Sequence, residues 1–275
     1  MSSQSSSGSK WVAGVLIVAI IALGAVFFYR EKQASVSAQA PPAAASSALA
    51  PPTAVNNAAL PEHPIGPASG STAGLPALGD SDESVLAGLL GLTSDGALKT
   101  LLRPDAIVPR MVATIDALPK QTIGMNVVPL RVPTGRFQVQ NADGMFAESK
   151  QNLQRYDTYM YVADHMDPKA VAAWYKRSYP LFQQAYRDLG TEGYFNDRLV
   201  EVIDHLLKAP EPKGQLQLIP AKVGYVYADA NYEQLSVGQK FMIRVGAENE
   251  AKLKAKLRAL REAILANAPA TTSTE

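Results

Sequence analysis

The stretch DPKAVAAWYKRSYPLFQQAYRDLGTEGYFNDRLVEVIDHLLKAPEP, residues 167–212, decides the fold because it contains the clearest helix boundaries in the chain. Asp167 is a favourable N-cap, and Pro168 suits the first helical position, where its missing N–H costs nothing. This pattern predicts a helix that runs to Leu189 and ends before a glycine. Pro180 interrupts the pattern and is expected to kink or divide that helix.

A second helix is predicted directly after the first, within the same stretch. Asn196 is expected to cap its N-terminus, because an asparagine side chain accepts hydrogen bonds from the free backbone amides of the first turn. Pro210 and Pro212 end it. Its buried side is a stripe at helical spacing that consists of Leu199, Ile203 and Leu206. Two amphipathic helices in succession favour a mainly helical domain.

Shorter helices and a small extended region are predicted on either side of this stretch. Further helices are expected at residues 82–92, 96–102, 107–118, 237–245 and 248–265. A turn at residues 141–144 and extended chain at 216–227 supply the β-structure, and Pro220 restricts the latter to a sheet edge or a strand end. We therefore expect a mainly α fold, α+β with a small β element, in one compact domain over residues 80–266.

The last of these helices has an apolar side that needs a partner. Two heptads are too few for a convincing coiled coil. Docking on the core of the same domain is therefore favoured over dimerisation. The apolar side consists of Leu253, Leu257, Leu260 and Ile264.

The N-terminal region carries a different signal. Residues 11–29, WVAGVLIVAIIALGAVFFY, contain no charged side chain and are flanked by Lys10 and by the charged residues 30–32. At about 1.5 Å rise per residue, such a helix nearly spans the roughly 30 Å hydrocarbon core of a bilayer, and its terminal aromatics suit the two interfaces. We predict a single transmembrane helix at residues 11–29, in contact with the lipid bilayer, after a polar tail at residues 1–10.

A cleaved signal peptide is the alternative for this region, since Ala38-Gln39-Ala40 resembles a cleavage site. The apolar run is longer than the roughly 7–15 residues of a signal-peptide core. Charged residues separate it from the cleavage site, and Pro41 follows that site directly, which disfavours cleavage. The sequence therefore favours a retained anchor.

The segment at residues 30–79 is predicted to be a flexible Ala/Pro-rich linker. Alanine, proline, serine and glycine dominate it, and such a composition cannot bury enough apolar surface to offset the entropy lost on ordering. Its prolines stiffen the chain, so that its reach lies between that of a coil and that of a polyproline rod. We expect a tether between membrane and domain. Residues 267–275 are expected to form a disordered tail.

Several segments of the domain together resemble one uncharacterised bacterial family. They are LLRPDAIVPRMVATIDALP (residues 101–119), PTGRF (133–137), YPLFQQAYRDLG (179–190), YFNDRLVEVIDHLL (194–207), APEP (209–212) and LSVGQKFMIRVGAENEAKLKAKL (235–257). In these segments the chain is similar to the family catalogued as domain of unknown function 3014. The resemblance implies an N-terminal anchor in the bacterial inner membrane and an Ala/Pro-rich linker. It implies no activity and no functional residues.

The compartment of the domain is not fixed by the charges that flank the apolar run, because both ends carry basic residues. The absence of cysteine is compatible with an oxidising compartment but also occurs in cytosolic chains. With the resemblance added, we expect a single-pass inner-membrane protein with a cytoplasmic N-terminus and a periplasmic domain. The opposite topology would make it a cytoplasmic-facing scaffold.

Composition and motifs restrict the classes of function. The formal net charge is +1, so there is no electrostatic case for binding nucleic acid. The chain lacks GxSxG, GxxxxGK and HExxH motifs and has no cysteine nucleophile. Three histidines leave little for a site built on several of them. We therefore expect no cofactor and no metal, and no sequence feature identifies catalytic residues.

The start of the second helix is the first place to look for a binding surface. It joins two helices and combines an aromatic pair with alternating charges, so it could contact a polymer or a peptide. A metal site or a carboxylate pair for acid/base cleavage of glycans would need these groups to converge, and a solvated face with local ion pairs is favoured over both. The candidate residues are Tyr194, Phe195, Asn196, Asp197, Arg198, Glu201, Asp204 and His205.

These observations favour a membrane-anchored periplasmic domain that binds an envelope protein or a cell-wall polymer without catalysing a reaction. The alternative is an envelope hydrolase, or a hydrolase activator, that acts on cell-wall material through the polar side of the second helix.

Overall fold

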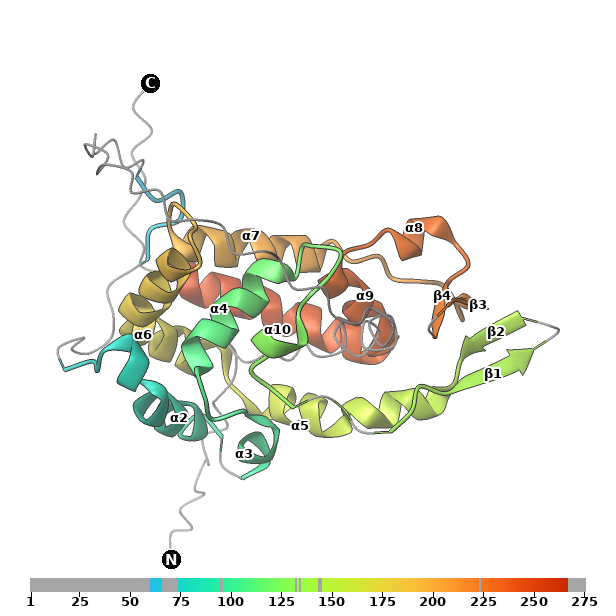
Figure 1. Ribbon diagram of the computed structural model, residues 1–275, viewed down its shortest axis with the longest axis horizontal. Coiled ribbons are helices and arrows are strands. Elements are labelled where there is room, and N and C mark those ends of the chain that lie inside the picture. The colour runs from blue at the N-terminus through green and yellow to red at the C-terminus, as the bar shows by residue number, and fades with distance from the viewer. Residues whose placement is uncertain are drawn as a thin grey trace, which may run out of the picture.

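Helices dominate the computed structural model of the chain, which describes residues 60–65, 74–93, 96–131, 133, 135–142, 145–222 and 224–266 (Figure 1). The α-helices are α2 (Asp82–Leu90), α3 (Ala97–Leu101), α4 (Ile107–Ala117), α5 (Asp157–His165), α6 (Pro168–Asp188), α7 (Phe195–Leu207), α8 (Ala230–Glu233), α9 (Val237–Arg244) and α10 (Ala247–Leu265). Short 3-10 helices are η1 (Leu78–Asp80), η2 (Met125–Val127) and η3 (Lys150–Tyr156). The predicted mainly helical character is confirmed.

The N-terminal predictions fall on residues that the structure does not describe. The membrane helix expected at residues 11–29, the tail at 1–10, most of the linker at 30–79 and the tail at 267–275 lie outside the described ranges. Among the described residues, no helix combines the length and the apolar character that crossing a bilayer requires.

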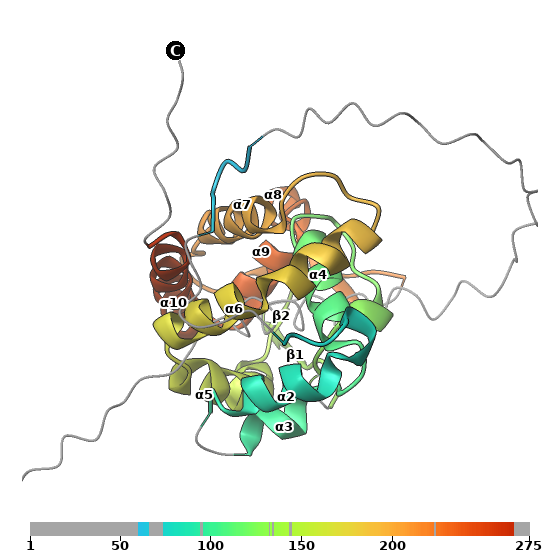
Figure 2. The same cartoon turned by 90° about the vertical axis from the view of Figure 1, so that its left-hand side faces the viewer.

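The body of the domain is built around α6. The 19-residue helix α10 packs along α6 and α7, and α4 also packs against both of these helices. Viewed from the side, α7 lies at one end of this bundle, and α2, α3 and α5 lie at the other (Figure 2). The apolar side of α10 is completely buried in this arrangement, which confirms that the helix docks on its own domain.

The predicted start of α6 is confirmed. The Asp167 carboxylate accepts hydrogen bonds from the backbone N–H groups of Lys169 and Ala170, at 3.0 and 3.2 Å. Pro180 lies inside the helix but does not divide it, because α6 continues from Pro168 to Asp188. Since Pro180 is exposed, the site of its missing backbone hydrogen bond is on the outer side of the helix.

The predicted cap of α7 is wrong. Asn196 lies inside the helix and is 1% exposed, and the residue at the N-cap position is Tyr194, whose side chain makes no capping bond. The backbone N–H of Phe195 instead donates to Oε1 of Gln183 on α6, at 2.9 Å. Phe195 is fully buried and stacks on Phe182, with ring centroids 5.6 Å apart. Burial of this ring places the helix start two residues earlier than the sequence predicts.

A four-stranded antiparallel sheet lies at one end of the helical body (Figure 1). Its order is β1 (Val139–Ala142), β2 (Met145–Glu148), β3 (Gln217–Pro220) and β4 (Tyr225–Tyr227). The expected turn at residues 141–144 includes residues 143 and 144, which lie outside the described ranges, and the strands β1 and β2 on either side of these two residues are paired. Pro220 is the last residue of β3, as its missing donor requires, and that strand is internal because it also pairs with β2.

A short N-terminal segment packs on the domain from inside the predicted linker. Residues 60–65 lie against the first turn of α7, and Ile65 packs against the hydrophobic core. Leu75 and Leu78 also contact that core. The packed part of the chain therefore includes residues that precede Asp80.

Candidate functional site

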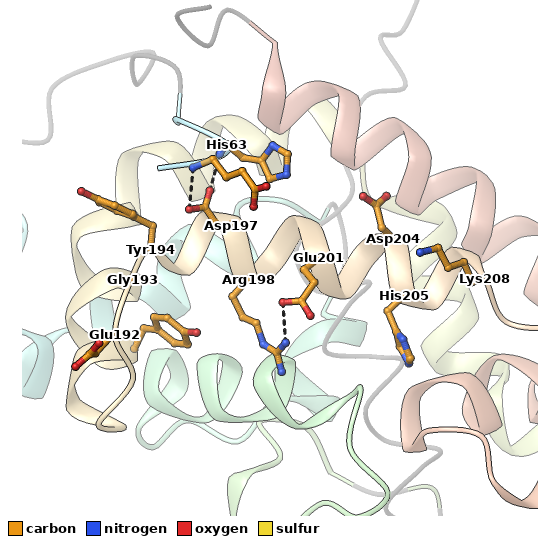
Figure 3. A pocket seen from close by; sticks show the side chains of 12 residues that line it. His63, Glu192, Gly193, Tyr194, Asp197, Arg198, Glu201, Asp204, His205 and Lys208 are labelled. Atoms are coloured by element: carbon orange, nitrogen blue, oxygen red, sulfur yellow. Dashed lines mark hydrogen bonds and ion pairs between the residues drawn. The ribbon is translucent and has the colours of Figure 1, made fainter. Parts of the chain in front are cut away.

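A groove of about 580 Å³ follows the exposed side of α7 (Figure 3). Of the predicted surface residues, those that line it are Tyr194, Asp197, Arg198, Glu201, Asp204 and His205. Phe195 and Asn196 do not line it, because both are buried under the first turn of the helix. We call this surface, with its further lining residues Glu62, His63, Tyr186, Glu192, Gly193 and Lys208, the α7 groove.

One end of the α7 groove holds a piece of polypeptide backbone. The Asp197 carboxylate accepts hydrogen bonds from the backbone N–H groups of Glu62 and His63, at 3.1 and 2.6 Å. The Asn196 amide donates to the His63 carbonyl oxygen, at 2.7 Å, and its own oxygen accepts from the hydroxyl of Tyr175, at 3.2 Å. Two consecutive residues of α7 thus bind three backbone groups of a segment more than 130 residues away.

The next residue along α7 connects the groove to a neighbouring helix. Arg198 donates through Nε to the Asp116 carboxylate at 2.8 Å and through Nη2 to the Asp116 carbonyl oxygen at 2.9 Å. Its remaining Nη1 donates to Glu201, at 2.8 Å. The Arg198 guanidinium therefore connects α7 to the end of α4, and it also pairs with Glu201 at the surface.

The C-terminal half of the groove is held by α10 and by the start of α9. Asp204 accepts two hydrogen bonds from Arg261, at 2.8 and 3.0 Å, in a bidentate pair. His205 Nε2 lies 2.7 Å from Oγ of Ser236. Burial lowers the pKa of His205, and the nearby charge of Lys208 lowers it further. The imidazole is therefore neutral at pH 7.

The polar side chains of α7 do not converge. Asp197 and Asp204 point to one side of the helix, whereas Arg198, Glu201 and His205 point to the other (Figure 3). Each of the three carboxylates is engaged by hydrogen-bond donors of the protein itself. Within the described ranges, no group of three or more potential metal ligands is found. The arrangement suits recognition of backbone or polar groups better than acid/base chemistry.

Several groups that shape the groove were missed from the sequence. Glu192 and Gly193 directly precede the predicted corner, so proximity in the chain was a usable signal for them. No local pattern connects α7 to its distant partners, which are Glu62, His63, Asp116, Ser236 and Arg261. Their positions depend on how the helices pack.

Comparison with known proteins identifies a family but no activity. No curated protein matches the chain, and no solved structure matches it. The model of one family, described as a protein of unknown function (DUF3014), matches residues 107–261. That match runs from the start of α4 into α10 and includes the whole of α7, while α2, α3 and residues 60–65 precede it. Because it covers more than half of the 275 residues, the chain belongs to the DUF3014 family.

Proposed function

We propose that this protein is a non-catalytic binding module of the bacterial cell envelope, and that its ligand is a polypeptide segment of an envelope protein. The observation that supports the proposal is that Asn196 and Asp197 form hydrogen bonds with the backbone of residues 62 and 63. A site that already holds one segment through main-chain groups has the chemistry to hold another.

The recognition at this end of the groove is directed at the main chain. The three hydrogen bonds use two N–H groups and one carbonyl, so they do not depend on the side chains of the bound segment. The bound residues lie between Pro61 and Pro64 and form a bend in the chain. Beyond them the α7 groove continues along the helix to Lys208. That part of the surface is available to a longer ligand.

The proposed location of this activity follows from the N-terminal sequence. An apolar helix at residues 11–29 would anchor the protein in the inner membrane, and the linker would let the domain reach partners in the periplasm. Composition and the family resemblance support this topology. A hydrolase is not proposed, because the carboxylates of α7 are held apart and are occupied by donors of the protein itself.

Site-specific photo-crosslinking in intact cells tests the ligand. A photoreactive amino acid replaces Lys208, which lines the groove and is exposed, and in a control strain it replaces Lys99 on α3 at the opposite end of the molecule. We expect a discrete protein adduct from position 208 that is absent from position 99 and is weakened by Asp197→Ala. Equal adducts at both positions, or adducts to cell-wall polymer alone, would contradict the proposal.

Cysteine labelling tests the compartment. The chain has no native cysteine, so a single Lys99→Cys change creates one exposed thiol in the domain. Cells with a permeabilised outer membrane are treated with a maleimide that does not cross the inner membrane, and Ser5→Cys in the N-terminal tail serves as the reference for the other side. Labelling at position 99 but not at position 5 is expected. The reverse result would indicate a cytoplasmic-facing scaffold.

A further inference from the structure

A second pocket lies away from the α7 groove, where the sheet meets the helical body. It has a volume of about 360 Å³ and lies between β2, β3, the start of η3 and the junction of α9 with α10. Its walls combine aliphatic side chains with two carboxyl groups and two cations. The residues that define this sheet pocket are Glu148, Lys150, Leu153, Leu216, Leu218, Ile243, Arg244 and Glu250. Its volume is within the range of about 300–1,000 Å³ that small-molecule sites occupy.

Glu250 is a buried carboxylate whose capacity to accept hydrogen bonds is not fully used by the described residues. Its side chain is 1% exposed, and its Oε1 lies 2.9 Å from the ammonium of Lys254. Lys254 also donates to the Ala209 carbonyl at 2.7 Å and to Glu211 at 2.6 Å. Glu250 Oε2 is buried and accepts no hydrogen bond from any described residue. Such a group costs free energy unless a ligand supplies a donor.

Glu148 presents a second such oxygen from the sheet side of the same pocket. Its Oε1 is buried and has no hydrogen-bond donor among the described residues. Burial raises the pKa of Glu148 even though Arg244 and Arg155 oppose that shift. The two carboxyl groups come from β2 and α10, more than one hundred residues apart, and both line one cavity. Asn152 donates to the Glu148 carboxyl group, yet each of the two groups keeps at least one buried oxygen without a donor.

The cations near the pocket restrict the charge of a ligand. Arg244 lies over the rings of Phe137 and Tyr227, at 5.1 and 5.2 Å, and donates to the Tyr227 hydroxyl at 3.2 Å. Lys150 is exposed and also lines the pocket. Because Lys150 and Arg244 already balance the charges of the two carboxyl groups in the lining, the pocket does not suit a polycation.

We infer that the sheet pocket binds a small organic amine, with one primary ammonium group between Glu148 and Glu250 and an apolar body against Leu153, Leu216 and Ile243. An ammonium group offers three donors, which matches the unsatisfied carboxylate oxygens. The aliphatic walls favour a hydrocarbon body over a sugar or a nucleotide. This site is separate from the α7 groove and does not depend on its proposed function.

Calorimetric titration of the full-length protein in detergent tests the inference. The probe is 2-phenylethylamine, and its neutral counterpart 2-phenylethanol reports on apolar binding and on partition into micelles. We expect saturable binding of the amine at least tenfold tighter than that of the alcohol. Equal affinities, or no saturable heat from the amine up to about 10 mM, would overturn the inference; that limit corresponds to the weak end of measurable affinities.

Three variants separate the site from general effects. Glu250→Gln keeps the shape of the side chain but removes its charge, and a loss of at least tenfold in amine affinity is expected. Glu248→Gln is the matched control, because Glu248 lies one half-turn earlier on α10, is exposed and pairs with Lys252. Leu216→Trp fills the cavity without changing any charge and should abolish amine binding. Unchanged affinity in Leu216→Trp, or equal affinities in both Gln variants, would contradict the site.

Discussion

At the scale of single residues, Asp197 joins two parts of the chain that are distant in sequence. Its carboxylate binds two backbone amides, and hydrogen bonds to a charged acceptor are stronger than neutral ones. We expect Asp197→Ala to lower the free energy of unfolding by about 1–2 kcal/mol, because the site is partly exposed and water replaces part of the loss. Urea unfolding measures this change.

Hydrogen exchange tests the role of Asp197 directly at the backbone amides of residues 62 and 63. Their amides should exchange faster in Asp197→Ala, while those of the α7 interior should change little. Glu201→Ala is the matched control, since the Glu201 side chain is 66% exposed and its ion pair is with Arg198. If the control accelerates exchange at these two amides equally, Asp197 does not hold the segment.

His205 makes stability depend on pH. Burial lowers its pKa in the folded protein below the usual value of 6.5, so the unfolded chain takes up the proton first as pH falls. Stability is therefore fully retained above about pH 6.5 and decreases below it, until the folded imidazole also becomes protonated.

His205→Gln removes this contribution and retains a polar group for Ser236. The variant should lose less stability than the wild type between about pH 6.5 and pH 5, as followed by urea midpoints. His165→Gln is the control, because His165 is exposed on α5. Parallel curves for the wild type and His205→Gln would show that His205 does not contribute.

At the scale of helices, the sequence predicts a helix start correctly where a neighbouring residue of the same segment caps the free backbone amides. Asp167 and Pro168 set the start of α6 through bonds within three residues, and this start was predicted. The cap of α7 was not predicted, because Gln183 reaches its first amide from another helix. Part of the lining of the α7 groove was predicted from the spacing of polar residues on α7. The proposal that it binds a partner stays a prediction.

The approach of α9 to its neighbours requires a glycine. The backbone N–H of Gly238 donates to the Leu118 carbonyl, at 3.0 Å, so the first turn of α9 is fixed to the end of α4. A Cβ at position 238 would lie 2.5 Å from Cδ2 of Leu206 and 3.1 Å from that same carbonyl oxygen. The carbonyl cannot move away without losing its hydrogen bond.

Gly238→Ala should therefore destabilise the protein by about 1–2 kcal/mol, although alanine is the better helix former by nearly 1 kcal/mol. The control is Gly96→Ala, where the added Cβ meets no atom within 4 Å and φ is −80°. That variant should stay within about 0.5 kcal/mol of the wild type. Thermal and urea unfolding of both variants check the difference.

At the scale of the whole molecule, local sequence patterns do not predict which distant segments pair in the sheet. The two halves of the sheet come from segments about 70 residues apart, and β2 pairs with β3 through Phe146 and Leu218. A turn was predicted at residues 141–144 and extended chain at residues 216–227, but nothing in either segment specifies the other. The sheet pocket has the same origin, because Glu148 and Glu250 line one cavity only when the sheet packs beside α9 and α10.

The cooperative unit extends beyond the region that defines the family. Helices α2 and α3 precede the matched residues 107–261, yet Leu89 and Leu98 are completely buried in the same core cluster as Leu257. A core shared in this way predicts that the N-terminal helices unfold together with the rest of the domain.

Leu89→Ala tests this unity. The change should cost about 2–4 kcal/mol, because a buried leucine is replaced within a packed core. The midpoint should shift equally in far-UV circular dichroism and in fluorescence of Trp174, which is 4% exposed on α6. Leu189→Ala, at a side chain that is 45% exposed, should leave both midpoints nearly unchanged. If circular dichroism shifts while Trp174 fluorescence does not, α2 and α3 form a separate unit, and the domain consists only of the part that matches the family.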